Sequence, residues 1–231
     1  MRSIGLVAGL SWESTLEYYR LINRGVNELS GESHSAPLWI YSFDFQEVVD
    51  HNRRGDFAGI GKLLEDAAIK LQTMGAEAIL LCANSAHRWA DRIEVSLQVP
   101  LLHIADATGV ALKKRNLAKP LLLGTSYTME GEYIRKKLED EYGAAVHIPD
   151  ESDRKALHNI IFDELVKGRF SGRSRRRVVD IINKRTPDVD SVILGCTELP
   201  LLIRRDDTNL PLLDTLRLHA ETAVDFITQA K

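Results

Sequence analysis

The stretch ILLCANSAH, residues 79–87, and the stretch VILGCTELP, residues 192–200, contain both cysteines of this 231-residue chain. In each stretch an apolar run leads to a cysteine, and small polar residues follow it. Buried strands of parallel sheets read as short apolar runs of this kind. The two stretches therefore predict two strands of an α/β fold, with Cys82 and Cys196 at their carboxyl ends.

Apolar runs alternate with helical patterns along the rest of the chain. Apolar residues recur at helical spacing in 16–29 and 60–74. Further strands are expected at 3–9, 37–45, 99–104, 119–124 and 210–214, with a weaker one at 144–149. Further helices are expected at about 128–141, 152–167, 172–185 and 214–229. Alternation of strands and helices predicts parallel sheets flanked by helices.

The two halves of the chain repeat one pattern: strand, hydroxyl-rich loop, helix, and later a strand with a cysteine. LVAGLSWEST in the first half corresponds to LLLGTSYTME in the second. This favours a duplicated α/β unit, with a boundary near 106–118. We expect two pseudo-symmetric lobes, 1–106 and 107–213, each a mainly parallel sheet flanked by helices. The closing helix, 214–231, is expected to return to the first lobe, and the active site to lie in a cleft between the lobes.

Composition excludes several classes of protein. The net charge of -3 argues against nucleic-acid and membrane-surface binding, and the basic run 168–185 is interpreted as the solvated face of a helix. No apolar run approaches the roughly 20 residues of a membrane helix. The first residues do not resemble a signal peptide, so we expect a cytoplasmic protein, in which free thiols are the default.

Two cysteines at strand ends suggest acid–base chemistry. Ligands of open parallel sheets bind beyond the carboxyl ends of the strands, and a polar turn at a helix start is expected to lower the pKa of a thiol. Burial of both cysteines in the core is the alternative. A redox dithiol lacks a CxxC motif, and a metal site using His87 lacks further ligands. Two thiols on opposite faces of one carbon could remove a proton and return another, which inverts a stereocentre.

Two hydroxyl-rich loops favour a carboxylate ligand. GLSWEST (9–15) and GTSYTME (124–130) each place hydroxyl and N–H groups at an expected helix start, where anions bind readily. Helix capping by Ser14, Thr15 or Thr128 is the alternative interpretation.

The chain resembles the aspartate/glutamate racemase family from about Ile4 to its C-terminus, most closely the broad-specificity amino-acid racemases. The similar motifs are GLSWESTLEYYRLIN, HSA, LCANSAH, HIADAT, LLGTSYTME, IIFDEL, LGCTEL and the closing DT with HAE. The resemblance implies a cofactor-independent racemase with two α/β lobes, in which Cys82 and Cys196 are the proton donor and acceptor. We also expect a homodimer. The positions that the resemblance assigns to substrate binding are Leu10, Ser11, Asn52, Ala83, Asn84, Ser85, Thr125, Lys167, Thr197 and Glu198.

The same resemblance bears on the substrate. Glutamate racemases of the family follow the second cysteine with Thr-His, whereas this chain has Thr197-Glu198. Leu10 stands where broad-specificity relatives usually carry Met. Lys167 matches a lysine that aspartate racemases use against the side-chain carboxylate, and Arg53 or Arg54 lies near a second basic position. Lys167 is alternatively a cation at a helix end beside a glycine.

Three functions therefore compete. The first is an amino-acid racemase, with aspartate or glutamate favoured over a broad range. The second is another cysteine-pair isomerase, such as a maleate isomerase or a hydantoin racemase. The third is an amino-acid-binding protein without turnover.

Overall fold

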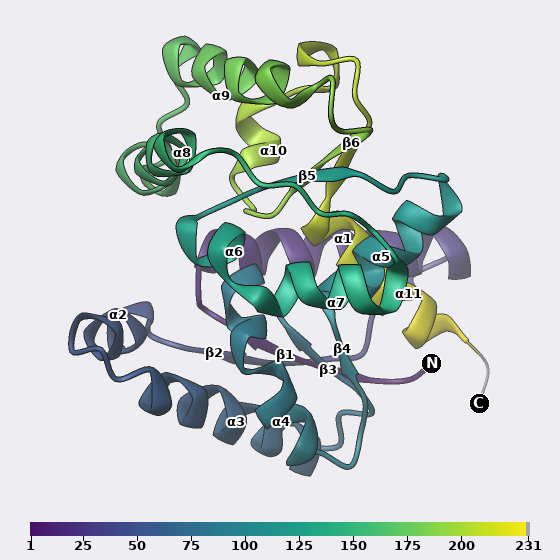
Figure 1. The fold of residues 1–231 in the computed structure, drawn as a ribbon. Coiled ribbons are helices and arrows are strands. Elements are labelled where there is room, and N and C mark those ends of the chain that lie inside the picture. Colours follow the sequence, from purple (N-terminus) through teal and green to yellow (C-terminus); the bar gives the residue numbers. More distant parts are fainter. Residues whose placement is uncertain (230–231) are drawn as a thin grey trace. The chain divides into compact units, whose positions relative to one another are not determined.

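The computed structural model describes residues 1–229 and divides into two compact units (Figure 1). The first unit contains Met1–His103 and the chain from His219 onward, and the second contains Ile104–Leu218. The sequence predicts lobe boundaries after residues 106 and 213. In the structure the chain leaves the first unit after His103 and re-enters it at His219, so the second unit is an insertion in the first.

The first unit is built on a four-stranded parallel sheet with the order β2-β1-β3-β4. Its strands are β1 (Ile4–Ala8), β2 (Leu38–Ser42), β3 (Ile79–Leu81) and β4 (Leu101–Leu102). All five residues of β1 and all three of β3 are buried, as expected for central strands covered on both faces. In the β1–β3 pair Val7 faces Leu81, so both strands end at the same edge of the sheet.

Helices cover this sheet and pack against one another. They are α1 (Trp12–Ser30), α2 (Phe45–Arg53), α3 (Phe57–Thr73), η1 (Asn84–Trp89), α4 (Ala90–Val95) and α11 (Thr215–Thr228). Figure 1 shows α3 and α4 together on one side of the sheet, where they form a core with β1 and β3. Helix α1 lies against α11, and glycine at position 25 allows the close approach. A Cβ there would be only 2.7 Å from Val224 Cγ2. A larger residue at position 25 would separate these two helices.

The second unit is built on a three-stranded parallel sheet with the order β5-β6-β7. Its strands are β5 (Pro120–Leu123), β6 (Ser191–Leu194) and β7 (Leu212–Asp214). The weak strand expected at 144–149 is reduced to one parallel bridge between His147 and Leu121 of β5. That bridge lies beside β5 as β2 lies beside β1, so strand pairing in the two units follows one plan.

Helices cover both faces of the second sheet. They are α5 (Ile104–Lys114), α6 (Ser126–Glu130), α7 (Glu132–Tyr142), α8 (Glu151–Asp163), η2 (Leu165–Lys167), α9 (Gly172–Arg185), α10 (Leu199–Leu202) and η3 (Arg205–Asp207). One apolar core joins α8 and α9 to β5 and β6, and a second joins α5 and α7 to the same sheet. Figure 1 shows α8 and α9 away from α5 and α7.

Helices α2, α4, α5 and the four-residue α10 lie outside the residue ranges in which helices were expected. Residues 106–118, expected to hold a boundary, mostly belong to α5. Helix α5 is buried on most of its surface, and small residues such as Ala107 and Gly109 form much of that buried surface, so few large apolar residues mark it at helical spacing. Helix α2 is nine residues long and buries none of them fully, and α4 is only six residues long, so each offers few apolar positions from which a helix could be predicted. Within residues 1–229, no helix combines the length and the apolar character needed to cross a membrane.

Candidate active site

Cys82 lies in the turn that follows β3, in the middle of the first sheet. Its backbone N–H donates to Val7 O of β1 at 2.9 Å, so the register of the two strands fixes the residue. Leu10 and Ala83 pack against one apolar core, which brings the turn after β1 next to the turn after β3. Asn84 and Ser85 follow at the start of η1. The structure thus gathers four predicted substrate contacts, Leu10, Ala83, Asn84 and Ser85, around the end of β3.

The Cys82 thiol is buried, with 1% of the residue exposed. Burial raises its pKa well above the usual value for a thiol. The prediction that a helix start would lower this pKa was wrong for Cys82. The helix that follows is a short 3-10 helix, six residues long, whose aligned dipole is too small to offset the loss of water.

The turn after β1 is shaped by a glycine and a capping serine. Gly9 has φ +79°, and a Cβ there would lie 2.4 Å from Phe43 N, so only glycine fits. Ser11 is the N-cap of α1, and its Oγ accepts from Ser14 N at 3.4 Å. Thr15 Oγ1 accepts from Gly9 N at 3.0 Å. Capping therefore falls to Ser11, and the alternative interpretation that named Ser14 or Thr15 as the cap was wrong.

Cys196 occupies the corresponding turn of the second sheet, after β6. The peptide before it is fixed by Gly195 N, which donates to Leu123 O of β5 at 2.7 Å. A Cβ at Gly195 would lie 2.9 Å from that same oxygen, so glycine lets the two chains approach. The turn that follows β5 contains Thr125, the N-cap of α6. Its Oγ1 accepts from Thr128 N at 3.4 Å. Here too the cap is the residue at the turn, Thr125, and not Thr128.

A carboxylate contacts the thiol of Cys196. Cys196 Sγ donates to Glu198 Oε2 at 3.0 Å, and Thr197 Oγ1 donates to the same oxygen at 2.8 Å. Burial raises the pKa of the Cys196 thiol, and the negative charge of Glu198 raises it further. Backbone N–H groups of Thr197 and Glu198 act in the expected direction and lower the pKa, but they are outweighed. The predicted fall in pKa was therefore wrong for Cys196 as well.

Asn52 lies near the end of α2 in the first unit. It is exposed, although Val48 of the same helix packs against the core that contains Leu10 and Ala83. Arg53 is exposed, and its Nη1 lies 3.7 Å from Asp50 Oδ1.

Lys167 is the last residue of the 3-10 helix η2 in the second unit. Its side chain is 51% exposed, and Nζ lies 3.8 Å from Asp163 Oδ1. The next residue, Gly168, has φ +70° and ends the helix. These contacts favour the interpretation of Lys167 as a helix-end cation, and they leave its amine accessible to a ligand.

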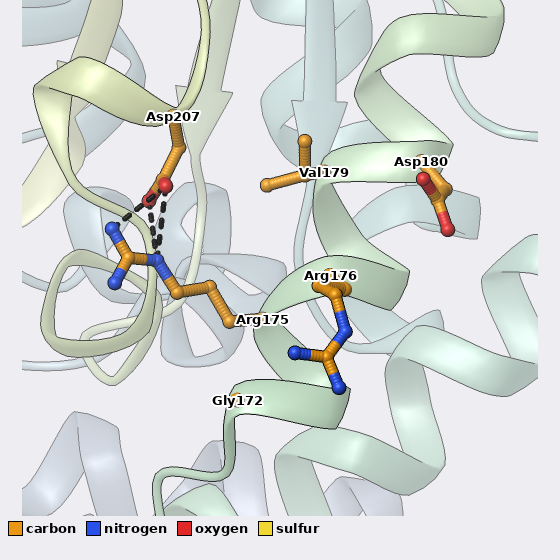
Figure 2. A pocket seen from close by; sticks show the side chains of 6 residues that line it. All are labelled: Gly172, Arg175, Arg176, Val179, Asp180 and Asp207. Atoms are coloured by element: carbon orange, nitrogen blue, oxygen red, sulfur yellow. Dashed lines mark hydrogen bonds and ion pairs between the residues drawn. The ribbon is translucent and has the colours of Figure 1, made fainter.

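The second unit also contains an open cavity of about 500 Å³ between α9 and η3 (Figure 2). Its lining residues are Gly172, Arg175, Arg176, Val179, Asp180 and Asp207. Arg175 is neutralised there by Asp207, with Nη2 to Oδ1 at 2.7 Å. None of the predicted substrate contacts belongs to this lining, so the cavity is separate from the candidate residues.

Two features of the site were missed in the sequence. Glu198 was expected to contact the substrate, whereas its carboxylate bonds the thiol two residues earlier. His87, considered only as a metal ligand, donates from Nδ1 to Ala83 O at 3.0 Å and lies among other buried histidines. No group of three or more His, Cys, Asp or Glu side chains in residues 1–229 has an arrangement that could hold a metal ion.

Comparison with known proteins identifies the family. The model of the Asp/Glu/Hydantoin racemase family matches residues 7–223, and the chain belongs to this family. A broad specificity amino-acid racemase, RacX of Bacillus subtilis (strain 168), is 23% identical over 96% of each chain. The glutamate racemase of Aquifex pyrophilus is 32% identical over 57% of this chain and 50% of its own length.

Solved structures agree with this assignment. The crystal structure of a putative Asp/Glu racemase from Yersinia pestis is 43% identical, with a TM-score of 0.94 over 99% of this chain and 100% of that one. An aspartate racemase homologue from Pyrococcus horikoshii OT3 is 34% identical, with a TM-score of 0.84 over the same shares. The expected fold of two helix-flanked parallel sheets and the resemblance to aspartate/glutamate racemases are confirmed.

Proposed function

We propose that this protein is an amino-acid racemase that uses Cys82 and Cys196 as the two acid–base groups at Cα. One observation carries the proposal: each unit holds one free cysteine in the turn after a central parallel strand, and in each unit the neighbouring strand leads to a helix capped by a hydroxyl residue, Ser11 or Thr125. The ordinary pKa of a thiol, about 8.5, suits proton exchange near neutral pH. Burial raises the pKa of both thiols above that value, so the mechanism needs a way to form the thiolate. Membership of a racemase family supports the same chemistry.

The reaction balances without a redox step. One cysteine, as thiolate, takes the Cα proton of one enantiomer, and the other, as thiol, gives its proton to the opposite face. The product is the other enantiomer, and the two cysteines have exchanged protonation states. The mechanism requires both sulfur atoms to reach one Cα from opposite sides. It uses no cofactor, since the protons come from the thiols and the substrate.

Glu198 supplies a way to form the thiolate of Cys196. The pair of Cys196 and Glu198 carries one negative charge, which lies on the carboxylate while Sγ donates to Oε2. Transfer of that proton to the carboxylate forms a thiolate without adding charge to a buried site. Free ionisation would add a second negative charge there, which the raised pKa of Cys196 opposes. We therefore assign to Glu198 the role of proton acceptor for Cys196.

An amino acid with an acidic side chain is the proposed substrate. Its α-carboxylate would meet N–H and hydroxyl groups of the Ser11 and Thr125 turns, where helices begin. Lys167 would meet the side-chain carboxylate, because its amine is half exposed and only weakly paired. The name of the Bacillus subtilis relative supports a broader range of amino acids, so the substrate test includes neutral side chains.

Solvent deuterium tests the function directly. The protein is incubated in heavy water with single L-amino acids, including aspartate, glutamate, alanine, methionine and homoserine, and in parallel with maleate and a 5-substituted hydantoin. We expect deuterium at Cα together with the D-enantiomer, with the highest rate for aspartate or glutamate. Turnover of only maleate or the hydantoin would identify the protein as another cysteine-pair isomerase, a maleate isomerase or a hydantoin racemase. Binding of an amino acid without exchange in any sample would indicate a binding protein and overturn the proposal.

A homodimer in solution stays a prediction, which sedimentation of the purified protein checks.

A further inference from the structure

Three histidines and a tyrosine form a buried cluster inside the first unit. His87, His103, His219 and Tyr18 are at most 9% exposed. The His87 ring lies between the other two histidines, with centroid distances of 4.5 Å to His103 and 5.5 Å to His219. Tyr18 packs edge-on against His219 at 5.7 Å. The cluster joins α1, η1, the end of β4 and α11, which are far apart in the sequence.

Hydrogen bonds fix the orientation of two of these rings. His219 Nε2 lies 2.7 Å from Leu102 O, and a carbonyl oxygen can only accept, so Nε2 carries the proton. In the neutral ring Nδ1 is then an acceptor, and the Tyr18 hydroxyl donates to it at 2.9 Å. His87 Nδ1 likewise donates to Ala83 O at 3.0 Å. Burial lowers the pKa of His87 to about 4 and that of His219 to about 3, which agrees with neutral rings.

The cluster meets the active-site turn through His87, which is hydrogen-bonded to the backbone of Ala83 and Asn84. Ala83 O accepts from His87 Nδ1 at 3.0 Å and from Ala86 N at 3.3 Å. On the other side of Cys82, its own N–H is bound to Val7 O of β1. The short segment Cys82–Ala83 is therefore held at one end by the sheet and at the other end by a histidine.

The cluster also lies where the chain passes between the units. His103 is the last residue of the first segment of unit 1, and His219 is the first residue of the returning segment. Both rings contact His87 edge to face. The ring that holds the Cys82 turn is thus itself held by the two residues at which the chain leaves and re-enters the first unit.

We propose that His87 is a positioning residue, which fixes the backbone after Cys82 through Ala83 O and is itself held in place by His103 and His219. This inference rests on the proposed function for its catalytic meaning, because position matters most for a group that must meet a substrate carbon. A displacement of about 1 Å at a reacting group can cost on the order of 100-fold in rate.

The first test needs no substrate. Cys82 is buried, so iodoacetamide reaches its thiol only when the turn opens. In His87→Leu, Ala83 O loses a donor, and we expect alkylation of Cys82 to be about 5- to 150-fold faster. His87→Asn places an amide N–H where Nδ1 was, and the rate should stay within about threefold of wild type. Mass spectrometry measures Cys82 and Cys196 separately in each sample.

The control variant is Leu64→Ala, which weakens the core of the same unit but removes no hydrogen bond from the turn. Its effect on Cys82 should appear only through global unfolding and should therefore increase steeply with urea. The effect of His87→Leu should already be present without urea and change little with it, because local opening exposes little surface. A steep urea dependence in His87→Leu, or an unchanged rate, would show that His87 is only a core residue and overturn the proposal.

The second test uses the reaction with L- and D-aspartate deuterated at Cα. The Haldane relation makes kcat/KM fall equally in both directions, so the primary isotope effects are the informative readout. If His87→Leu impairs proton transfer by Cys82 alone, the isotope effect should increase for the enantiomer that Cys82 deprotonates and decrease for the other. Equal changes would count against a role specific to Cys82. Wild-type protein that racemises no amino acid would refute the proposed function, while the alkylation test would still decide the role of His87.

Discussion

Cys82 and Cys196 occupy the same position in two similar sheets, yet their thiols have different neighbours. Cys196 donates to the carboxylate of Glu198 and accepts from two backbone N–H groups. For Cys82, burial alone raises the pKa, and the nearby polar side chain of His87 bonds the adjacent backbone. One unit thus places a carboxylate beside its cysteine thiol, and the other fixes the backbone beside its cysteine. In the proposed mechanism the two acid–base groups are therefore not equivalent.

The largest effect is expected from removing either thiol. Cys82→Ala and Cys196→Ala should each lower the racemisation rate by about 10³-fold or more, since one face of Cα then lacks its acid or base. Circular dichroism should show that both variants remain folded.

Serine variants sharpen the comparison. From the family resemblance we expect Cys196 to remove the Cα proton of the L-enantiomer and Cys82 that of the D-enantiomer. Cys196→Ser should therefore slow Cα exchange mainly in the L-enantiomer, and Cys82→Ser mainly in the D-enantiomer. Racemisation near the wild-type rate in either Ala variant would refute the two-cysteine mechanism.

Glu198→Gln tests the difference between the two thiols. We expect a loss of about 10²-fold in kcat, because the proton of Cys196 no longer has an acidic acceptor. The pKa of Cys196 should fall at the same time, since a negative charge beside the thiol has been removed. The pH dependence of alkylation measures this fall.

Thr197→Val is the matched control, because it removes the second hydrogen bond to Oε2 and keeps the carboxylate. Its kcat should change little compared with that of Glu198→Gln. An unchanged kcat in Glu198→Gln would show that the carboxylate only shapes the turn.

The buried polar groups of the two units differ in charge, which predicts a difference in acid stability. The first unit buries neutral histidines, whereas the second buries Asp153 between Arg177 and Lys184, with Lys184 Nζ 2.8 Å from Oδ2. The folded-state pKa values of His87 and His219, about 4 and 3, lie below the unfolded value of 6.5. The unfolded chain therefore binds protons first as the pH falls, and the stabilisation present above pH 6.5 is lost as the pH falls toward 4.

At pH 5 the free energy of unfolding should be about 2–4 kcal/mol lower than at pH 7.5, measured by urea titration. As the pH is lowered, amide protection measured by hydrogen exchange should fall in the first unit before it falls in the second. Carboxylates with a lowered pKa, such as those of Glu65 and Asp207, contribute only at lower pH. In His87→Asn the loss between pH 7.5 and 5 should be about half as large, and an unchanged loss would assign it to other groups.

The smallest effect is expected at Lys167. Lys167→Leu should lower kcat/KM for aspartate or glutamate by about 10-fold, the low end for a charge-assisted hydrogen bond, because this amine is half exposed. Alanine, methionine and homoserine should be little affected. Arg53→Leu in the first unit is the comparison variant. An equal loss for all five amino acids would identify Lys167 as a helix-end cation, and specificity would then be sought near Asn52 and Arg53.

The positions of the cysteines were predictable because the signals are local. Apolar runs that end in Gly195-Cys196 or at Cys82 define buried strands and their ends from neighbouring residues alone. The capping residues lie three positions before the predicted Ser14 and Thr128. Ser11 and Thr125 supply the accepting oxygen, and Ser14 and Thr128 supply the N–H group. A run of hydroxyl residues does not show which of them has extended backbone.

Other parts of the site depend on tertiary structure. The contact of His87 with His219 joins residues 132 positions apart, and no local pattern encodes it. The raised pKa values of the thiols follow from burial. The polar residues after both cysteines did not indicate this burial in the sequence. Helix α5 was not predicted for a related reason, because tertiary contacts bury it on most sides and small residues such as Ala107 and Gly109 form much of that surface.

The insertion of one unit into the other determines the order in which the protein becomes complete during translation. All of Ile104–Leu218 leaves the ribosome before His219 and Val224, which pack against Tyr18 and Gly25 of α1. A nascent chain can therefore have the whole second sheet outside the ribosome while the first sheet, synthesised earlier, still lacks its last helix. The first unit begins before the second and is completed after it, because α1 packs against His219 and Val224, which follow the second unit in the chain.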